Sequence, residues 1–436
     1  MSDRNVVALG ALVLALHGPL SAQEGTTFVV RESAMPCLNV RTRPQPAARV
    51  LTCLTPDTQV PGLGTAPYWR EVRLPDGRSG WAAKQFLEVV AGPAAAVAPP
   101  AAPPAAAAEA LADAWLEVHV VDVGQGDGIW IHTPDDGTPG NGRFEGRNIV
   151  IDGGPDGSDA RNELLKYLQR LAPEGADIDA LILTHPHNDH YPGALGILRH
   201  FEVHDYYDSG FPKEGPQFAG FLDAVRAERA DGAPIRLHMG PDQFGTPDWG
   251  SELEVEFLYA YPGSPDGLGS GNTLENNASI VLRLTYGDQS LLFMGDAEGK
   301  DRSDSPDTPK YVERLLLDSP GAARLKSTIL KIAHHGSETS STLPFIEAVD
   351  PDYVIVSSGR KSFSGTFLPD RSTLARYCAR KPGTRIFRTD QDDEDEGRTT
   401  QNDTDGDHVL IRMNGTSTIV DAFSGGVRVT PTACVP

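Results

Sequence analysis

Residues 91–112 divide this chain into two parts that must fold separately. The stretch reads AGPAAAVAPPAAPPAAAAEALA and consists almost entirely of Ala and Pro. It offers no side chains large enough to build a core, so it behaves as a semi-extended spacer. With 436 residues, the chain is long enough for more than one core. We therefore expect a small module over residues 26–90, a linker over residues 91–114 and a large module over residues 115–436.

The small module carries short β-type runs separated by turn signals, among them TTFVV, LNVRTRP and YWREVRLPDGRSGWAA. The PDG tripeptide predicts a hairpin, and several strands in so short a segment predict a small barrel. The module resembles a bacterial SH3-type domain in LNVRTRP (38–44), Tyr68-Trp69 and DGRSGWAAKQFL (76–87). The resemblance implies binding of cell-wall peptide or glycan. The alternative is that Trp69 and Trp81 are simply the core of the barrel.

The N-terminus predicts a secretory signal peptide over residues 1–22. Arg4 is a short positive region, Val6 to Leu16 are the apolar core, and PLSAQE ends in small residues. We expect cleavage after Ala22 and hence a secreted or periplasmic protein. The apolar run is too short to span a bilayer, and no other run predicts a membrane span. The alternative is a buried N-terminal helix.

The cysteines fit an exported protein. Cys37 and Cys53 lie in the small module, and Cys378 and Cys434 lie near the C-terminus. Pairing Cys37 with Cys53 and Cys378 with Cys434 is the simplest of the three connectivities that four cysteines allow. No pair has CxxC spacing, so we do not expect a cysteine-based zinc site.

The net charge of −22 limits the partners of the chain. It argues against a general binder of nucleic acid or anionic membranes, because no basic surface offsets the repulsion from phosphates. It does not exclude an enzyme that holds a single phosphate through a metal ion.

The large module alternates apolar strands with helical segments, which predicts an α/β fold. WLEVHVVDV, GIWIHT, RNIVIDGG and IDALILTH read as strands, and ARNELLKYLQRLA carries leucines at helical spacing. ELEVEFLYA, ASIVLRLTYGDQSLLFMGD, STILKIAHHGS and DYVIVSSG read as later strands. Polar residues follow the C-terminal ends of these strands, where α/β folds tend to place their sites.

Three histidines and an aspartate gather in THPHNDH, directly after the strand IDALIL, although the whole chain has only 12 His. In an extended segment, residues two apart point the same way, so His185 and His187 can reach one metal ion. Asp189 and His190 follow in the turn and can serve a second ion. Imidazole and carboxylate groups suit Zn²⁺, and the HEXXH pattern of mononuclear proteases is absent. The alternative is a polar loop that is merely rich in histidine.

Two later segments can complete such a site. LLFMGDAE places Asp296 just after an apolar strand, where its carboxylate can bridge two ions. LKIAHHGS places His334 and His335 at the end of another strand. Because adjacent residues of a strand point to opposite sides, we expect His335 to bind metal and His334 to contact substrate. The alternatives are that Asp296 is a turn residue and that the histidine pair is half core.

Six motifs occur in an informative order: VDVGQGD (121–127), IDGG (151–154), THPHNDH (184–190), NNASIVLRL (276–284), MGD (294–296) and KIAHHGS (331–337). With them, the large module resembles the metallo-β-lactamase-fold hydrolases. The nearest branch is the soluble hydrolase domain of ComEC-type DNA-internalisation proteins and its secreted relatives, including phosphorylcholine esterases. The resemblance spans about residues 117–422. It implies a four-layer αββα sandwich with a metal pair at one edge of the two packed sheets.

The resemblance also implies two divalent ions, zinc or manganese, that share a bridging hydroxide as the nucleophile. The implied ligands are His185, His187, Asp189, His190, Asp296 and His335. Asp296 would bridge the ions, and Asp189 and His334 would take part in catalysis. Asp152 of IDGG would orient a histidine ligand from behind, and Asp127 would lie beside the metals near the substrate.

The chain departs from this branch in one ligand. Many relatives carry a further histidine before the MGD motif. His200, His204 and His238 lie in that region, but none sits in a pattern that assigns it. The missing ligand is therefore one of these three or none.

A second departure concerns the substrate side. Near residues 364–369 the branch often shows a His-x-Pro element, whereas this chain reads SGTFLP, with Phe367 in place of the histidine. Arg360, Lys361 and Arg371 are the candidates to hold a substrate phosphate instead.

The expected function is hydrolysis of a phosphodiester or related phosphoester outside the cytoplasm, in nucleic acid or in cell-wall phosphorylcholine. One alternative is a hydrolase of amides or lactones, including β-lactams. Another is a non-catalytic wall-binding protein with a relic metal site.

Overall fold

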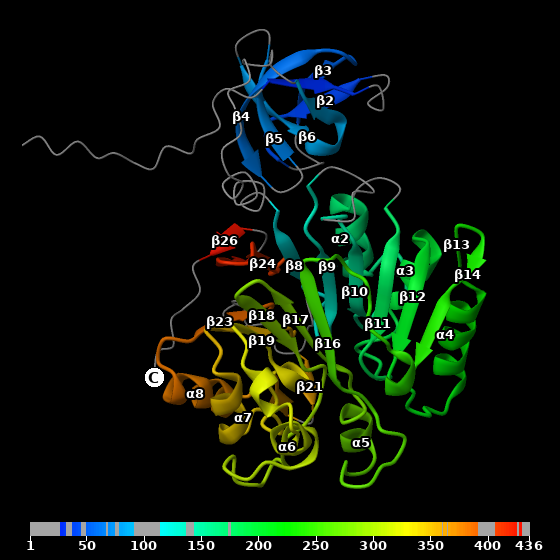
Figure 1. Cartoon of the computed structure of the whole chain (residues 1–436), viewed down its shortest axis with the longest axis vertical. Coiled ribbons are helices and arrows are strands. Elements are labelled where there is room, and N and C mark those ends of the chain that lie inside the picture. The colour runs from blue at the N-terminus through cyan, green and yellow to red at the C-terminus, as the bar shows by residue number, and fades with distance from the viewer. Residues whose placement is uncertain are drawn as a thin grey trace, which may run out of the picture. The chain divides into compact units, whose positions relative to one another are not determined.

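The computed structural model of the chain describes residues 27–31, 37–44, 49–66, 69–74, 78–90, 114–136, 144–172, 176–359, 361–363, 365–390, 406–424 and 427–429. The chain divides into two compact units, Met1–Pro100 and Ala101–Pro436, which are described separately (Figure 1). The expected signal peptide lies outside the described residues, as does the expected linker up to residue 113, so both stay predictions. Across the described residues, every helix is too short or too polar to cross a bilayer.

The first unit is all-β, as the sequence predicted. Its strands are β1 (Thr27–Val30), β2 (Leu38–Arg41), β3 (Val50–Leu54), β4 (Gln59–Ala66), β5 (Trp69–Arg73), β6 (Ser79–Ala83) and β7 (Leu87–Val89). They form one seven-stranded sheet in the order β3-β2-β6-β5-β4-β1-β7. Strands β5 and β6 pair antiparallel on either side of the expected PDG turn, which itself lies outside the described residues. The closer assignment to SH3-type domains stays a prediction.

The two tryptophans of the first unit differ in burial. Val40, Val60 and Val72 are fully buried in its core, and Trp69 is buried with them. Trp81 is partly exposed, so only one of the two tryptophans is plainly a core residue.

The cysteine pairing is confirmed where the structure describes it. A disulfide joins Cys37 to Cys53, from the start of β2 to β3. Cys378 is also disulfide-bonded, and Cys434, its expected partner, lies outside the described residues.

The second unit contains two large sheets. The nine-stranded sheet has the order β15-β12-β11-β10-β9-β8-β24-β25-β26. Its strands are β8 (Leu116–Val120), β9 (Gly128–His132), β10 (Asn148–Gly153), β11 (Ile178–Leu183), β12 (Val203–Asp208), β15 (Arg236–Met239), β24 (Val409–Met413), β25 (Thr418–Ser424) and β26 (Val427–Val429). Strands β10, β11, β12 and β15 run parallel, so their C-terminal ends share one edge.

The six-stranded sheet has the order β16-β17-β18-β19-β20-β23. Its strands are β16 (Leu253–Tyr259), β17 (Val281–Tyr286), β18 (Gln289–Phe293), β19 (Ile329–Lys331), β20 (Tyr353–Val356) and β23 (Arg385–Arg388). Two small ribbons complete the strands: β13 (Arg229–Ala230) with β14 (Ala233–Pro234), and β21 (Ser362–Phe363) with β22 (Thr366–Phe367). Strands β18, β19, β20 and β23 also run parallel and end together.

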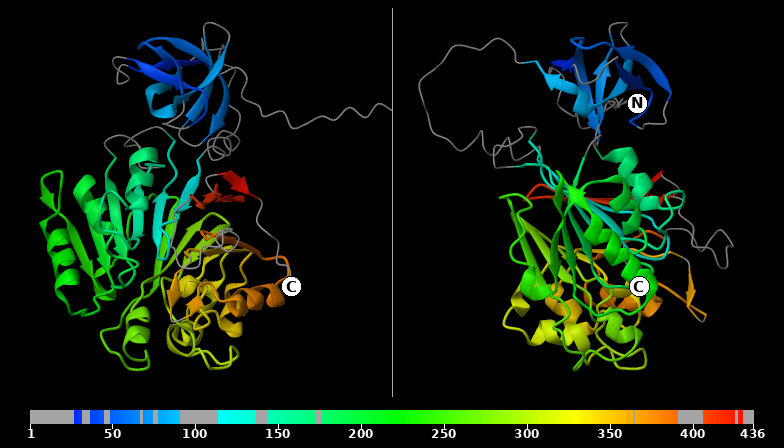
Figure 2. Two further views of the ribbon diagram at one scale, coloured as in Figure 1. Left: turned by 180° about the vertical axis from the view of Figure 1, so that it is seen from behind. Right: turned by 90° about the vertical axis from the view of Figure 1, so that its right-hand side faces the viewer.

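Helices cover the outer faces of both sheets (Figure 1, Figure 2). They are α2 (Glu163–Leu171), α3 (Ala194–His200), α4 (Pro216–Ala227), α5 (Asn272–Asn276), α6 (Tyr311–Asp318), α7 (Leu343–Val349) and α8 (Arg371–Arg380). Leu164, Leu165 and Leu168 of α2 are buried, and Leu171 is partly buried. The N-terminus of α2 is capped by Asn162, whose side chain accepts a hydrogen bond from the Leu165 amide.

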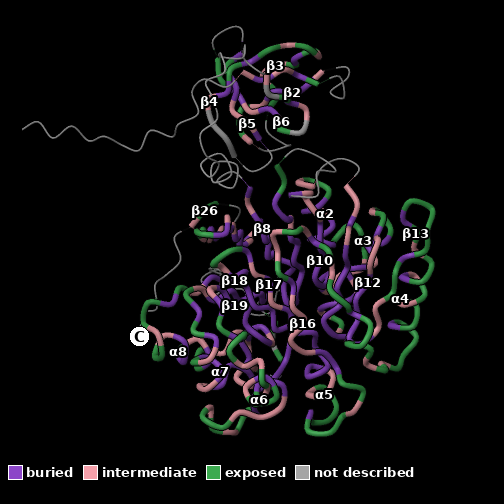
Figure 3. The backbone as a smooth tube through the Cα atoms, in the orientation of Figure 1, coloured by how far each residue is buried: buried purple, intermediate pink, exposed green. Residues whose placement is uncertain are grey.

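The main core lies between the two sheets. It joins residues such as Ile149 and Ile182 of the nine-stranded sheet to Leu291 and Ile355 of the six-stranded sheet. A second core packs α6, α7 and α8 against the other face of the six-stranded sheet. Buried residues follow the strands, while exposed ones gather on outer helices and loops (Figure 3). This is the four-layer αββα sandwich that the motif order predicted.

Candidate metal centre

The histidine-rich segment is held against IDGG by backbone contact. A Cβ atom at Gly193 would lie 1.7 Å from the Gly153 carbonyl oxygen, and one at Gly153 would lie 2.0 Å from the Ala194 nitrogen. The Gly153 amide donates to the His190 carbonyl oxygen at 2.6 Å. Only glycine permits so close an approach, and it brings Asp152 directly behind His190.

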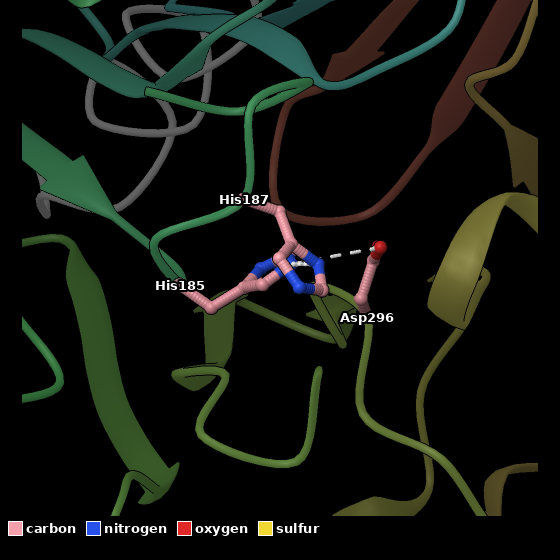
Figure 4. A group of neighbouring side chains, drawn as sticks. All are labelled: His185, His187 and Asp296. Carbon is pink, nitrogen blue, oxygen red and sulfur yellow. Dashed lines mark hydrogen bonds and ion pairs between the residues drawn. The ribbon is translucent and has the colours of Figure 1, made fainter. Parts of the chain in front are cut away.

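His185, His187 and Asp296 form the first ligand group (Figure 4). Strand β11 ends at Leu183, and both histidines follow it and face the same space, as expected. His185 Nε2 and His187 Nδ1 are 3.0 Å apart, and His185 Nε2 lies 3.7 Å from Asp296 Oδ2. Three donor atoms thus converge on a space that one ion can fill.

Asp189, His190 and His335 form the second ligand group. His335 Nε2 lies 3.6 Å from Asp189 Oδ2, and His190 Nε2 lies 4.0 Å from Asp189 Oδ1. Asp296 Oδ2 lies 3.4 Å from both His190 Nε2 and His335 Nε2, so this carboxylate faces both groups. The structure therefore brings together all six residues predicted as ligands.

In the first group, the second ring nitrogen of each histidine is already bonded. His185 Nδ1 lies 3.1 Å from Thr184 Oγ1, and the Thr184 hydroxyl donates to Asp152 at 2.6 Å. His187 Nε2 lies 3.0 Å from a carboxylate oxygen of Glu275. These acceptors place the hydrogen on the outer nitrogen and leave the inner nitrogen as a lone-pair donor.

The second group follows the same rule. His190 Nδ1 donates to Asp152 at 2.8 Å, and His335 Nδ1 donates to the Ser357 carbonyl oxygen at 2.7 Å. The predicted role of Asp152 behind a histidine agrees with this geometry.

The inner nitrogens of His185 and His187 contact each other at 3.0 Å, whereas the inner nitrogens of the second group have no hydrogen bond among the described residues. His190 Nε2, His335 Nε2 and Asp296 Oδ1 are buried without a hydrogen bond. Leaving buried polar atoms unpaired costs roughly 1–3 kcal/mol each. Divalent cations satisfy such imidazole and carboxylate atoms, so the residues fit a metal pair.

The charges of the cluster favour added cations. Burial alone would raise the pKa of Asp296, but His335 and His190 hold this pKa well below its usual range. Burial alone would lower the pKa of His335, but Asp296 and Asp127 raise it to about 10. The pKa of His190 is also raised, whereas burial lowers the pKa of His185 and of His187. Protons on His190 and His335 thus stand where metal ions would otherwise balance the carboxylates.

Asp127 lies behind the second group and is paired with a residue that the sequence analysis missed. Lys331 Nζ lies 2.7 Å from Asp127 Oδ2, and both side chains are buried. Asp127 Oδ1 lies 3.5 Å from His335 Nδ1. A lysine within the apolar strand STILKIA was the available signal, because a buried lysine requires a partner.

The side chains of His334 and His335 point in different directions, as expected, but the reason differs from the expected one. They were expected at the end of a strand, but β19 ends at Lys331 and both histidines follow in a tight turn with φ of 49° and 52°. That turn, rather than strand alternation, sends them apart. His335 enters the cluster, and His334 lines the cavity beside it, where its Nδ1 lies 3.0 Å from Thr339 Oγ1.

A cavity of about 520 Å³ opens over the cluster. Its described lining includes Lys213, Glu275, Asn276, Glu298, Arg302 and Phe363. Lys213 is ion-paired with Glu275, and Arg302 holds Asp370 through two hydrogen bonds. None of these residues was predicted as part of the site, although Asn276 lies in the motif NNASIVLRL and Glu298 in LLFMGDAE. The other four lie in segments that carry no metal or phosphate pattern.

The candidates for a missing histidine ligand lie elsewhere. His200 is bonded to Asp159, His204 to Asp177 and His238 to Asp205. The structure therefore places none of these three histidines as the missing ligand.

The predicted phosphate contacts are not brought to the cavity. Lys361 is exposed and lies over the Phe363 ring, and neither Lys361 nor Arg371 is among the described residues that line the cavity. Arg360 lies outside the described residues. The cations that do line the cavity, Lys213 and Arg302, replace them as candidates.

Comparison with known proteins agrees with the fold. The metallo-beta-lactamase superfamily profile matches residues 143–360, which is half of the chain. The chain is 30% identical over 219 residues to recombination protein 2 of Haemophilus influenzae, covering 49% of this chain and 22% of that protein. It is 27% identical over 289 residues to ComE operon protein 3 of Bacillus subtilis, covering 63% of this chain and 32% of that protein.

The chain thus spans about a fifth to a third of the length of these curated relatives. Among solved structures, a zinc-bound PqqB from Methylobacterium extorquens is similar, with 14% identity, a TM-score of 0.32, and coverage of 60% of this chain and 95% of that one. Proteins of the matched superfamily are generally metal-dependent hydrolases. The chain belongs to the metallo-β-lactamase superfamily, in the branch of the ComEC-type competence proteins that its motifs predicted.

Proposed function

We propose that the second unit is a dinuclear metal hydrolase that cleaves a phosphodiester or related phosphoester. The observation that carries this proposal is the paired state of the four clustered histidines. Each has one ring nitrogen bonded to an outer acceptor and the other directed at Asp296 or at a neighbouring ligand. Such prior orientation is typical of metal ligands.

Two divalent ions, zinc or manganese, fit these residues. His185, His187 and Asp296 would hold one ion, and Asp189, His190, His335 and the same Asp296 would hold the other. When bound, the ions would lower the pKa of water towards about 7 and neutralise charge on the substrate oxygens.

The chain's own residues supply orientation around the cluster. Asp152 fixes two of the histidines, directly at His190 and through Thr184 at His185. Asp189 and His334 are the residues proposed to contact the reacting group. His334 is held through Nδ1 by Thr339 and lies 3.3 Å from Glu298. Its Nε2 lies 3.4 Å from the side-chain amide of Asn276, which also lines the cavity.

The polar cavity supports a phosphoester over a lactam or amide. Lys213 and Arg302 both line it, and cationic donors suit the non-bridging oxygens of a phosphate. The relatives are named for recombination and for competence, which favours nucleic acid among the phosphoesters. The acidic net charge of −22 favours short or single substrates over long polymers.

The proposed location is outside the cytoplasm, secreted or periplasmic. The Cys37–Cys53 disulfide fits an oxidising compartment. The first unit would then bind cell-wall peptide or glycan, as SH3-type domains of bacteria do, and carry the second unit to its substrate.

Metal analysis followed by a substrate panel tests the function. The purified chain should contain two equivalents of divalent metal and should hydrolyse bis-nitrophenyl phosphate or a phosphorylcholine ester. The Asp189→Ala variant should lose this activity while keeping its thermal unfolding temperature within a few degrees. Turnover of nitrocefin alone would overturn the phosphoester assignment, and a chain with neither metal nor turnover would be a relic site.

A further inference from the structure

In the sequence, helix α5 lies between His190 and Asp296, the stretch in which relatives carry a further histidine ligand and this chain has none that can be assigned. It lines the cavity, and its Glu275 places a carboxylate oxygen 3.0 Å from His187 Nε2. His187 Nδ1 lies 3.0 Å from His185 Nε2 and thus faces the cluster. The helix therefore contributes an acceptor behind a histidine instead of a ligand.

Among the outer partners of the four histidines, Glu275 differs from the rest in burial. Thr184, behind His185, is buried. Asp152, behind His190, is fully buried, and so is Ser357, whose carbonyl oxygen holds His335. Glu275 is 20% exposed and lies on a five-residue helix at the cavity wall. His187 is thus the ligand whose support can be altered from the solvent side.

The two groups also differ in the number of donors. Counting Asp296 in both, the first group has His185, His187 and Asp296, whereas the second adds this carboxylate to three ligands of its own. Fewer donors hold an ion less firmly, and they make the orientation of each remaining donor matter more.

Lys213 competes for the carboxylate that supports His187. Its ammonium group is ion-paired with Glu275 Oε2, the same oxygen that faces His187 Nε2. The ammonium draws negative charge away from the histidine and adds a positive charge near the first ion. Both effects weaken the binding of a cation at His185, His187 and Asp296.

We propose that Glu275 is a positioning residue that holds His187 for one metal ion, and that Lys213 opposes it, so that this ion is the more easily exchanged of the pair. The inference rests on the proposed two-metal function. It assigns opposite effects to two residues that are bonded to each other, which a merely structural role of α5 does not predict.

The test measures metal affinity on the full chain. Zn²⁺ is titrated in competition with a chromophoric chelator, and the stepwise dissociation constants are fitted for wild type, Glu275→Gln and Lys213→Met. Glu275→Gln should weaken the looser ion by about 10–100-fold and leave the tighter ion unchanged. Lys213→Met should tighten the looser ion by on the order of tenfold, because a nearby positive charge is removed.

Glu256→Gln is the matched control. Glu256 is also partly buried and ion-paired, with Arg283 and Arg324, but it lies on β16 and does not line the cavity. Both zinc constants should equal those of wild type. Thermal unfolding of each variant without metal confirms that the chain remains folded.

The outcomes separate the inference from the function on which it rests. Loss of affinity in both Glu275→Gln and Lys213→Met would show that the pair only packs α5, and it would overturn the inference. Unchanged constants in Glu275→Gln would do the same while leaving the two-metal site intact. A wild-type chain that binds fewer than two ions would overturn the proposed site, and the inference with it.

Discussion

The Lys331 ammonium group lies 2.7 Å from the Asp127 carboxylate, and both side chains are at most 2% exposed. The pair joins β19 of one sheet to the VGQGD loop of the other, directly behind His335. Its burial makes each partner depend on the other, because a buried charge without a counter-charge is costly.

Lys331→Met should therefore destabilise the second unit by about 3–5 kcal/mol, since it leaves the buried Asp127 carboxylate uncompensated. The free energy of unfolding is measured by urea denaturation at pH 7. Adding Asp127→Asn to Lys331→Met should recover part of the loss. A single variant as stable as wild type would mean that water or a proton compensates Asp127.

Gly126 sets the position of Asp189. Its φ is +143°, and a Cβ atom there would lie 2.2 Å from the Asp189 carbonyl oxygen. Gly126→Ala should move the Asp189 carboxylate and weaken metal binding by about 10–100-fold, as displaced ligand supports do. Gly220→Ala is the control, because Gly220 lies in α4 with nothing within 4 Å of its Cβ position. That variant should bind metal normally and gain up to about 1 kcal/mol of stability.

Removal of metal should lower the unfolding temperature. The inner atoms of His190, His335 and Asp296 are buried without hydrogen bonds, so bound ions stabilise the folded state selectively. At a free metal concentration of 100 times the dissociation constant, the gain is about 2.7 kcal/mol. Calorimetry with EDTA and with added Zn²⁺ measures the difference. Asp296→Asn should show a much smaller response, and an equal response would mean that zinc binds elsewhere.

His408 should make the second unit sensitive to mild acid. Burial, followed by the charges of Arg170 and His119, lowers the pKa of His408 to about 3. The Asp122 amide donates to His408 Nδ1 at 2.9 Å, which requires an unprotonated nitrogen. Above about pH 6.5 the histidine is neutral in the folded and unfolded chain, so it has no effect on pH dependence there. Below that pH only the unfolded chain takes up the proton, and stability falls towards pH 3.

The variant His408→Asn keeps an acceptor but does not titrate. Its loss of unfolding free energy between pH 7 and pH 5 should be smaller than that of wild type by about 2 kcal/mol. Equal slopes in wild type and His408→Asn would show that His408 is protonated in the folded chain.

The sequence predicted those features that depend on local pattern. Strand β11 is apolar apart from Asp179 up to THPHNDH, so the sequence directly predicted that His185 and His187 follow the end of a strand. Glu275 could not be found this way, because its contact with His187 depends on the path of the connection between β16 and β17, two strands of the six-stranded sheet. The turn at His334 and His335 was also missed, since nothing in LKIAHHGS shows that the strand ends at Lys331.

Asp296 and His335 follow strands of the six-stranded sheet, while His185, Asp189 and His190 follow strand β11 of the nine-stranded sheet. Two metal ions bound by these residues would therefore connect the nine-stranded sheet to the six-stranded sheet. With metal bound, the two sheets should unfold in one cooperative transition, and amide hydrogen exchange should be slow across both sheets. Stripped protein should instead separate along the seam between the sheets, so metal supply would also govern resistance to proteolysis.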